Sequence, residues 1–392
     1  MSILFLLRLW PVYGGGESVT RLLANEFISM GHDVHVAYFK YSTCNTQPAI
    51  DSRIQQHHIE NVPCDEYTSN DIEDTHGVNE TICDIINRNS IDVVINQWFP
   101  RSYIKDIKQK TNAKVIWCLH TIFAQPFEKP KNFTKWLKYT LFPNHYKNRL
   151  IHTAVNNVEA SLPYVDKYVF LSDAYKQQFM SWSNSKDKDK IAVIPNPIPF
   201  QYSLSEPEIK GKENIVLVVG RMQEVTKKYS NVIKAWRLFE RGKDPLLDNW
   251  KLVMVGDGES LDEYKKMAEQ YKLTRITFEG FQSPIDYYRK AKIFLLTSRI
   301  EGFPMAILEA QQMGVVPIAM DSFPAIHDTI QDNTNGLLVP KNDVRALKEK
   351  IVYLMRNDSI RKTLCENGLS SSQRFSVKSV MNMWTILFNE LQ

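Results

Sequence analysis

Two glutamates stand eight positions apart in the stretch SRIEGFPMAILEA, residues 298–310. Glu301 lies in a loop after a predicted strand. Glu309 lies on a helix that can begin at Pro304, where a missing N–H costs nothing. Eight residues at about 1.5 Å each span at most roughly 12 Å, the scale that separates the two sugar rings of a nucleotide-sugar. Each carboxylate can accept hydrogen bonds from one sugar, and the helix N-terminus between them suits phosphates. The alternative for Glu309 is a partly buried glutamate with a local partner.

A basic group that could hold a diphosphate follows another predicted strand. Arg221 comes directly after LVVG, residues 217–220, and Lys227 and Lys228 follow six and seven residues later. An arginine at a strand end and a lysine on the adjoining loop can bind a diphosphate from two sides. A solvated pair of surface charges is the alternative.

Two strand ends in the first half of the chain carry further candidates. The turn VYGGGES places Gly15 and Gly16 between a strand and a helix, where glycine allows the backbone to approach an anion closely. A flexible strand–helix joint is the alternative. His120 ends the strand KVIWCLH and is the histidine best placed for a ligand, against the alternative of a structural histidine.

The sequence does not indicate a metal site. His57 and His58 have no cysteine or acid at ligand spacing around them. Asp187 and Asp189 resemble the DxD metal motif, but they lie in the charge run SKDKDK, which favours a solvated loop. We therefore expect no bound metal.

The same alternation of strands and helices occurs twice along the chain. Apolar strands alternate with amphipathic helices, which predicts mostly parallel sheets covered on both faces. This alternation is interrupted at residues 194–214, where three prolines in five positions exclude a helix interior or a central strand. We expect a linker there, between two Rossmann-like halves whose strand ends face a ligand cleft. The predicted strands are residues 3–10, 33–39, 92–97, 114–120, 167–172, 214–220, 250–256, 276–281, 293–298 and 315–321.

Composition agrees with a two-domain globular protein. The chain has 392 residues, a net charge of +4 that is too small to demand nucleic acid, and 43% apolar residues. Its five scattered cysteines favour reduced thiols in a cytoplasmic protein. The opening MSILFLLRLW is interrupted by Arg8 and has no basic start, so we interpret it as a strand and not as a signal peptide.

These segments together resemble the retaining glycosyltransferases of family 4. Glu301 and Glu309 match the family's E-x7-E signature, and VVGRMQEVTKKYSNVIKAW resembles its Gly-Arg…Lys diphosphate site. GGGE resembles the glycine-rich first loop, VIPNPI the interdomain junction, and VMVGDGE, ITFEGF and NTNGLLVP occur in family order. The resemblance covers nearly the whole chain.

The resemblance implies the GT-B fold, an α/β architecture of two Rossmann-like domains that face each other across a cleft. The N-terminal domain, 1–196, would bind the acceptor, and the C-terminal domain, 214–375, the nucleotide-sugar. Residues 197–213 would form the linker. The last helix, 376–392, would pack across the seam.

The resemblance also implies roles for individual residues. Glu301 would lie by the donor sugar, with His120 facing that sugar, and Arg221 and Lys227 would hold the diphosphate. Lys227 is preferred to Lys228 by counting back from NVIKAW, although its spacing from Arg221 is one residue longer than usual. Pro304 stands where many members have glycine, so the phosphates would meet the N–H groups that remain. The implied substrate-binding residues are Gly15, Gly16, Asn196, Phe281 at the base, Gly302, Phe303, Met305, and Glu309 at the ribose.

The implied reaction is transfer of a sugar, with retention of configuration, from a nucleotide-sugar to a saccharide or lipid-linked acceptor. UDP is the favoured nucleotide, surface polysaccharide the favoured product, and no metal or other cofactor is expected. Two alternatives remain open: a sugar-nucleotide epimerase on the same fold, and a non-catalytic scaffold that binds the nucleotide-sugar.

A basic and aromatic segment extends from residue 101 to 152. It has 11 lysines and arginines against two acids, and Trp136 and Tyr139 are among the interleaved aromatics. Such a composition suits an anionic membrane surface. Aromatics buried in the N-terminal domain are the alternative. We expect a cytoplasmic protein that associates with the inner face of the membrane through this segment, and no nucleic-acid partner.

Overall fold

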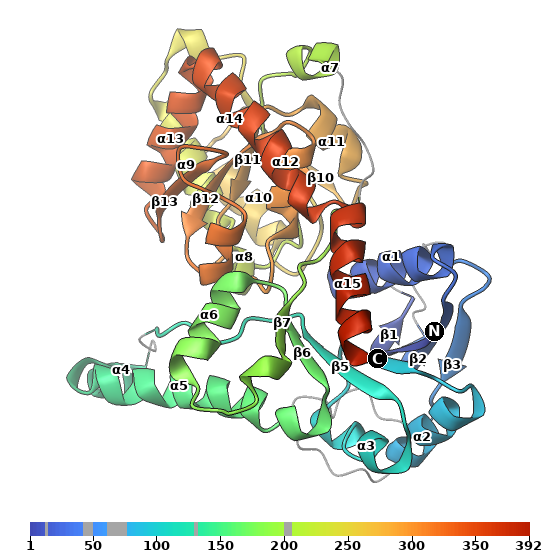
Figure 1. Cartoon of the computed structure of the whole chain (residues 1–392). Coiled ribbons are helices and arrows are strands. Elements are labelled where there is room, and N and C mark those ends of the chain that lie inside the picture. The colour runs from blue at the N-terminus through green and yellow to red at the C-terminus, as the bar shows by residue number, and fades with distance from the viewer. Residues whose placement is uncertain (12–14, 42–49, 61–76, 129–131, 200–205) are drawn as a thin grey trace. The chain divides into compact units, whose positions relative to one another are not determined.

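The computed structural model describes the chain except for residues 12–14, 42–49, 61–76, 129–131 and 200–205. The chain divides into two compact units (Figure 1). Met1–Asn196 and Val380–Gln392 form the N-terminal unit, and Pro197–Ser379 form the C-terminal unit.

A seven-stranded parallel sheet forms the core of the N-terminal unit, in the order β3-β2-β1-β4-β5-β6-β7. Residues 3–7 of β1 are fully buried, as expected for a strand covered on both faces. The strands are β1 (Ser2–Trp10), β2 (Asp33–Tyr41), β3 (Gln55–His58), β4 (Val93–Asn96), β5 (Lys114–Leu119), β6 (Lys167–Phe170) and β7 (Ile191–Val193). The helices are α1 (Gly15–Ser29), α2 (Val78–Arg88), α3 (Ile107–Lys110), α4 (Phe133–Leu141), α5 (Pro143–Glu159) and α6 (Asp173–Trp182).

The last helix, α15 (Val377–Leu391), returns to the N-terminal unit and runs beside α1 (Figure 1). The ring of Phe27 on α1 lies 5.9 Å from that of Trp384 and 5.3 Å from that of Phe388. Lys167 and Glu390 add an ion pair of 2.7 Å. Aromatic burial therefore holds the end of the chain against its beginning.

A six-stranded parallel sheet forms the core of the C-terminal unit, in the order β10-β9-β8-β11-β12-β13. Its helix α9 buries Val232, Trp236 and Phe239 on one face, the pattern of an amphipathic helix on a sheet. The strands are β8 (Ile215–Val219), β9 (Lys251–Val255), β10 (Ile276–Gly280), β11 (Ile293–Leu296), β12 (Val316–Asp321) and β13 (Leu337–Pro340). The helices are α7 (Glu206–Lys210), α8 (Glu224–Lys227), α9 (Ser230–Arg241), α10 (Leu261–Gln270), α11 (Ile285–Lys290), α12 (Met305–Gln312), α13 (Val344–Arg356) and α14 (Asp358–Ser372).

Two parallel, doubly wound sheets confirm the predicted fold class, and three short strands and one helix correct its details. His57 and His58 belong to the edge strand β3, which was not predicted, and the ring nitrogen Nε2 of His57 lies 2.9 Å from Nδ1 of His35 on β2. An edge strand can be polar because one side of it meets solvent. The strands β7 and β13 are likewise absent from the prediction, and α7 forms within the predicted linker.

Both sheets reverse their strand order once, between β1 and β4 and between β8 and β11. In open parallel sheets, ligands bind outside the carboxyl ends of the strands at such a reversal. The candidate residues after β8 and β11, and those after β1, are therefore brought to the edge where a ligand is expected, and His120 follows β5, the neighbour of β4.

Candidate functional site

The loops after β8 and β11 are tied together in the C-terminal unit. The hydroxyl of Thr297 donates to the carbonyl oxygens of Lys227 at 2.9 Å and Lys228 at 3.1 Å. The N–H of Arg299 donates to the carbonyl of Thr226 at 2.7 Å. These bonds fix the short helix α8 against the loop that carries Glu301.

Lys227 and Glu301 meet directly. The Lys227 Nζ lies 2.5 Å from Oε1 of Glu301, and the hydroxyl of Ser298 donates to the same oxygen at 2.7 Å. The Lys227 side chain is 23% exposed and that of Glu301 is 17% exposed. Both charged groups are therefore accessible from solvent, at the edge of the sheet where a ligand is expected. The structure brings together these two predicted residues although they are separated by 74 positions.

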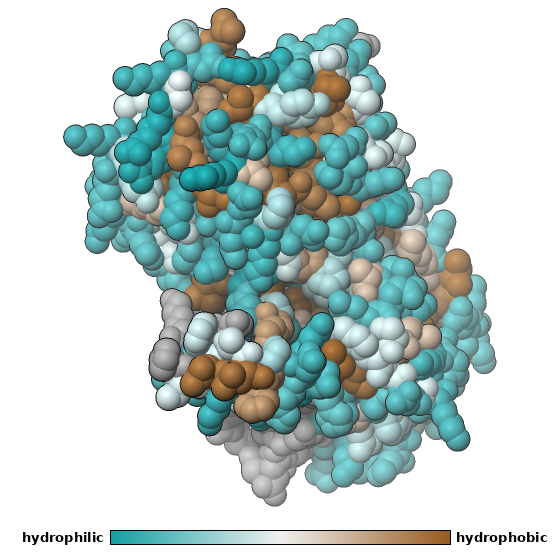
Figure 2. Space-filling model, turned by 90° about the vertical axis from the view of Figure 1, so that its left-hand side faces the viewer, coloured by the Kyte–Doolittle hydropathy of each residue, from teal (hydrophilic) through white to brown (hydrophobic). Residues whose placement is uncertain are grey.

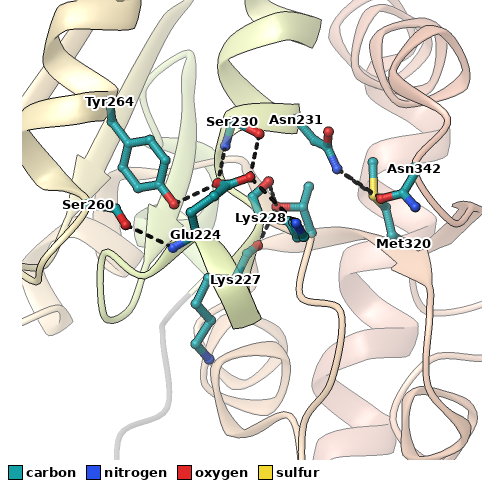
Figure 3. A network of polar contacts seen from close by, with 10 residues as sticks. Glu224, Lys227, Lys228, Ser230, Asn231, Ser260, Tyr264, Met320 and Asn342 are labelled. Carbon is teal, nitrogen blue, oxygen red and sulfur yellow. Dashed lines mark hydrogen bonds and ion pairs between the residues drawn. The ribbon is translucent and has the colours of Figure 1, made fainter. Parts of the chain in front are cut away.

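Lys228 takes a different direction. It ends α8 in the left-handed conformation, with φ 54°, and its Nζ lies 3.9 Å from Glu224. Glu224 also accepts hydrogen bonds from Ser230 and from the hydroxyl of Tyr264. Figure 3 shows this network around Glu224, with the Lys227 side chain pointing away from it. Lys228 therefore belongs to a network that fixes α8 to α9.

Close backbone contact fixes the position of Arg221. Gly220 has φ 148°, and a Cβ on Gly256 would lie 2.0 Å from the Gly220 carbonyl oxygen. Glycine is therefore required where the ends of β8 and β9 meet. Arg221 follows directly and is exposed to solvent, where its guanidinium is accessible to an anion.

Glu309 projects from the second turn of α12. Its Oε2 accepts a hydrogen bond of 3.0 Å from the hydroxyl of the fully buried Tyr288. Burial raises the pKa of Glu309 to about 7, against the smaller lowering effects of this hydrogen bond and of Lys227. The carboxyl group therefore titrates in the neutral range, which is unusual for a glutamate.

The remaining candidates of this unit lie around α12 and β10. Pro304 immediately precedes α12, after the predicted phosphate-binding residues Gly302 and Phe303. The Phe303 ring is buried against Phe375, so only the backbone of this residue could meet a ligand. The N–H of Met305 donates to the Phe303 carbonyl at 2.9 Å and is already engaged. Phe281 follows β10 and is 65% exposed.

The candidates of the N-terminal unit lie mostly at strand ends. Gly15 and Gly16 begin α1, after β1, and Asn196 is buried at the end of the unit. His120 follows β5, and its ring stacks on Trp98 with centroids 5.4 Å apart. Burial lowers the pKa of His120 to about 4, so the imidazole is neutral at physiological pH.

The structure adds Gln97 and Trp98, which sequence reasoning missed. Both amide atoms of Gln97, the Trp98 Nε1 and both ring nitrogens of His120 are buried without a hydrogen-bond partner in the described part of the chain. Buried polar groups are nearly always paired, so such a cluster at a ligand edge indicates binding of a polar ligand. The available signal was the position of NQW directly after a buried strand, beside the strand that ends at His120.

Asn96 holds this cluster in place. Its Oδ1 accepts from the N–H of Phe99 at 2.8 Å, and its Nδ2 donates to the Phe99 carbonyl at 3.0 Å. The turn that presents Gln97 and Trp98 is thus closed by a fully buried side chain. No group of three or more histidine, cysteine or acidic side chains suited to a metal ion occurs among the described residues.

Comparison with protein families decides the classification. Residues 13–202 match the family described as Glycosyltransferase Family 4, and residues 203–370 match the one described as Glycosyl transferases group 1. The chain belongs to glycosyltransferase family 4. The family predicted from the E-x7-E signature is confirmed.

Relatives of this family 4 protein include enzymes named for bacterial glycan synthesis. The chain is 28% identical over 204 residues to a Campylobacter jejuni protein named as an undecaprenol-diphosphate-linked saccharide alpha-1,4-N-acetyl-D-galactosaminyltransferase, which covers 52% of this chain and 55% of that protein. It is 28% identical over 273 residues to the lipopolysaccharide 1,6-galactosyltransferase of Salmonella typhimurium, 62% of this chain and 73% of that protein. The chain thus spans little more than half of the first relative.

Solved structures share the fold over the whole length. HepE of Anabaena, solved in complex with UDP, has a TM-score of 0.73 at 17% identity and covers 100% of both chains. TarM of S. aureus, solved with UDP, has a TM-score of 0.73 at 16% identity and covers 99% of both chains. These similarities confirm the two-domain GT-B fold of this family 4 protein.

The raised pKa of Glu309 predicts a specific pH dependence of stability. Between about pH 4.5 and 7 the folded state binds more protons than the unfolded state, so stability should fall as pH rises through this window. Glu309→Gln removes the charge and should raise Tm relative to the parent at about pH 8, with little difference at about pH 5. The same substitution at exposed Glu349 is the control, and parallel Tm curves for Glu309→Gln and parent would contradict the assignment.

Proposed function

We propose that the chain is a retaining glycosyltransferase that moves a sugar from a nucleotide-sugar, UDP-sugar favoured, to a saccharide or lipid-linked acceptor in surface polysaccharide synthesis. The contact of Lys227 with Glu301 at the end of β11 carries the proposal, because it pairs a cation for a diphosphate with an acceptor for sugar hydroxyls. Family membership, the galactosaminyl- and galactosyltransferase relatives, and HepE solved with UDP and glucose support it.

The C-terminal unit binds the donor in this proposal. Arg221 and Lys227 neutralise the diphosphate, Glu309 accepts hydrogen bonds from the ribose, and Glu301 accepts them from the transferred sugar. The C1–O bond to the diphosphate breaks while a C1–O bond to the acceptor forms on the same face of the ring. The proton of the acceptor hydroxyl passes to an oxygen of the leaving diphosphate. Electrostatic stabilisation of that diphosphate, together with positioning, supplies the rate enhancement.

The N-terminal unit supplies saccharide-binding groups. A neutral His120 and the amide of Gln97 each offer a donor and an acceptor, and the paired donors and acceptors of sugar hydroxyls match them. The ring of Trp98 adds an apolar face of the kind that sugar C–H groups contact. This reading accounts for the buried polar atoms that have no partner in the described chain.

A membrane surface is the proposed second partner. Trp136, Leu141 and Phe142, on α4 and at its C-terminal end, are 40%, 61% and 61% exposed, with Lys135 and Lys138 exposed beside them. Figure 2 looks toward the end of the molecule where α4 lies in Figure 1 and shows a hydrophobic patch among polar residues. Exposed apolar rings beside lysines suit the headgroup region of an anionic leaflet, where a lipid-linked acceptor would lie. No described helix is long and apolar enough to cross a membrane.

Turnover of the purified chain tests the function. Release of UDP from UDP-sugars should require an acceptor and persist in EDTA. Arg221→Ala or Lys227→Ala should lower kcat by about 10²–10³, more than either weakens donor binding, because charge grows on the leaving diphosphate. Lys228→Ala is the neighbouring control and should be mild. A new sugar-nucleotide formed without acceptor would indicate an epimerase, and donor binding without turnover a scaffold.

Gln97→Leu should separate activity from stability. Removing two buried, unpartnered amide atoms should leave Tm unchanged or raised, while loss of about two hydrogen bonds to the saccharide lowers kcat/KM for the acceptor roughly tenfold or more. Asn96→Leu is the control beside it and should lower the free energy of unfolding by about 1–3 kcal/mol, because both the oxygen and the nitrogen of the Asn96 amide are hydrogen-bonded. Reduced stability of Gln97→Leu with full activity would assign Gln97 to the structure alone.

Flotation with liposomes tests the membrane surface. The parent should float with anionic vesicles at low salt and less at high salt, since each lysine near the leaflet contributes about 1 kcal/mol and the attraction is screened. The double variant Lys135→Glu, Lys138→Glu should lose flotation while keeping its Tm. The double variant Lys265→Glu, Lys266→Glu, with the same charge change on exposed positions of α10, should float like the parent. Absence of flotation with either lipid would favour a soluble acceptor.

A further inference from the structure

A pocket lies in the C-terminal unit, at the amino ends of β8 and β11. This is the opposite edge of the sheet from Arg221 and Ser298, since Lys212 and Lys292 precede these strands. The pocket has a volume of about 400 Å³, within the range of small-molecule sites. Basic side chains dominate its lining: Lys210, Lys212, Lys292, Arg361 and Lys362.

Two carboxylates also line the pocket, and each is already paired. Asp358 contacts Arg361, and Glu366 lies 3.7 Å from Lys362, both within α14. These two pairs leave no carboxylate of the described lining for Lys212 or Lys292.

Among the described residues, the hydrogen-bond partners of Lys212 and Lys292 are neutral oxygens. Lys212 is 7% exposed and donates to the carbonyl oxygens of Tyr288 at 2.7 Å and Arg289 at 3.0 Å. Lys292 donates to Oδ1 of Asn214 at 2.6 Å. Neither ammonium has a carboxylate within ion-pair distance in the part of the chain that the structure describes. Neutral oxygens satisfy the hydrogen bonds, but they do not balance a buried charge, which proteins normally pair.

Lys292 and Arg361 also lie against the same ring. Lys292 Nζ lies 5.8 Å from the centroid of the buried Trp250 ring, and the guanidinium of Arg361 lies 5.5 Å from the same ring. Burial, and then the charge of Arg361, lower the pKa of Lys292, and burial lowers the pKa of Lys212 to about 7. Cations held together in a desolvated pocket are stabilised when an anion joins them.

We propose that this pocket binds the phosphate group of a small molecule, inorganic phosphate or a phosphate monoester, through Lys212, Lys292 and Arg361. A phosphate would accept hydrogen bonds from the ammonium groups and balance the charges of Lys212 and Lys292, and Arg361, which already contacts Asp358, would add its positive charge beside them. The site goes beyond the proposed function, because it lies at the edge of the sheet away from the donor site and takes no part in the transfer.

Thermal unfolding of the full chain in inorganic phosphate, against chloride of equal ionic strength, tests the proposal. UDP is held at saturation so that phosphate does not report on the donor site. We expect a saturable rise in Tm of about 2–4 °C, because a ligand that binds only the folded state stabilises it. Glucose 6-phosphate in place of phosphate distinguishes a phosphate monoester from the free ion.

Lys292→Gln should abolish the phosphate-dependent rise while leaving the rise caused by UDP intact. Lys292 is half-buried, so this variant should fold even where Lys212→Met does not. Lys265→Gln, at an exposed position of α10, is the charge-matched control and should respond like the parent. No rise in the parent, or an equal rise in Lys292→Gln, would overturn the site. If UDP did not shift Tm, that result would instead count against the proposed function. The phosphate-dependent rise in Tm would then be measured in Arg221→Ala.

Discussion

The reversal of strand order between β8 and β11 is the constraint on which the candidate donor site depends. Because β9 and β10 extend the sheet on one side and β12 and β13 on the other, the loops after β8 and β11 have no strand between them. The loop from Arg221 and the loop to Glu301 meet there, joined through Thr297 and the backbone of α8. Without that reversal, Lys227 and Glu301 would have no reason to lie 2.5 Å apart.

Buried polar atoms without a partner, and buried charges without a counter-charge, mark functional surface in this protein more clearly than any single motif. The sheet cores are apolar and their backbone groups are paired in parallel ladders, so a buried polar atom without a partner is conspicuous. In the N-terminal unit the conspicuous atoms belong to Gln97, Trp98 and His120. The C-terminal unit differs: Lys212 and Lys292 are bonded to neutral oxygens that do not balance their charge, and burial raises the pKa of Glu309 to about 7.

The central strands could be predicted from sequence because burial on both faces demands an unbroken apolar run. Strands such as β1 and β11 satisfy that demand by themselves. The edge strands β3, β7 and β13 could not be predicted in the same way, whereas the edge strand β10 was predicted. Gln55–His58 form β3 only because β2 supplies hydrogen bonds along one side, and the three residues of β7 depend equally on β6. Their stability comes from a neighbour that is distant in sequence, so no local pattern records them.

The sequence by itself determined the family, the fold class and the pair Glu301 and Glu309, because these depend on local spacing and on the alternation of strand and helix. Tertiary structure decided which groups meet. It directs Lys227 toward Glu301 and Lys228 toward Glu224, since α8 ends at Lys228 in a left-handed turn. It also places Trp98 beside His120, because β4 and β5 are neighbours in the sheet. Contacts across strands depend on register and topology, and neither is written in the spacing of residues along one segment.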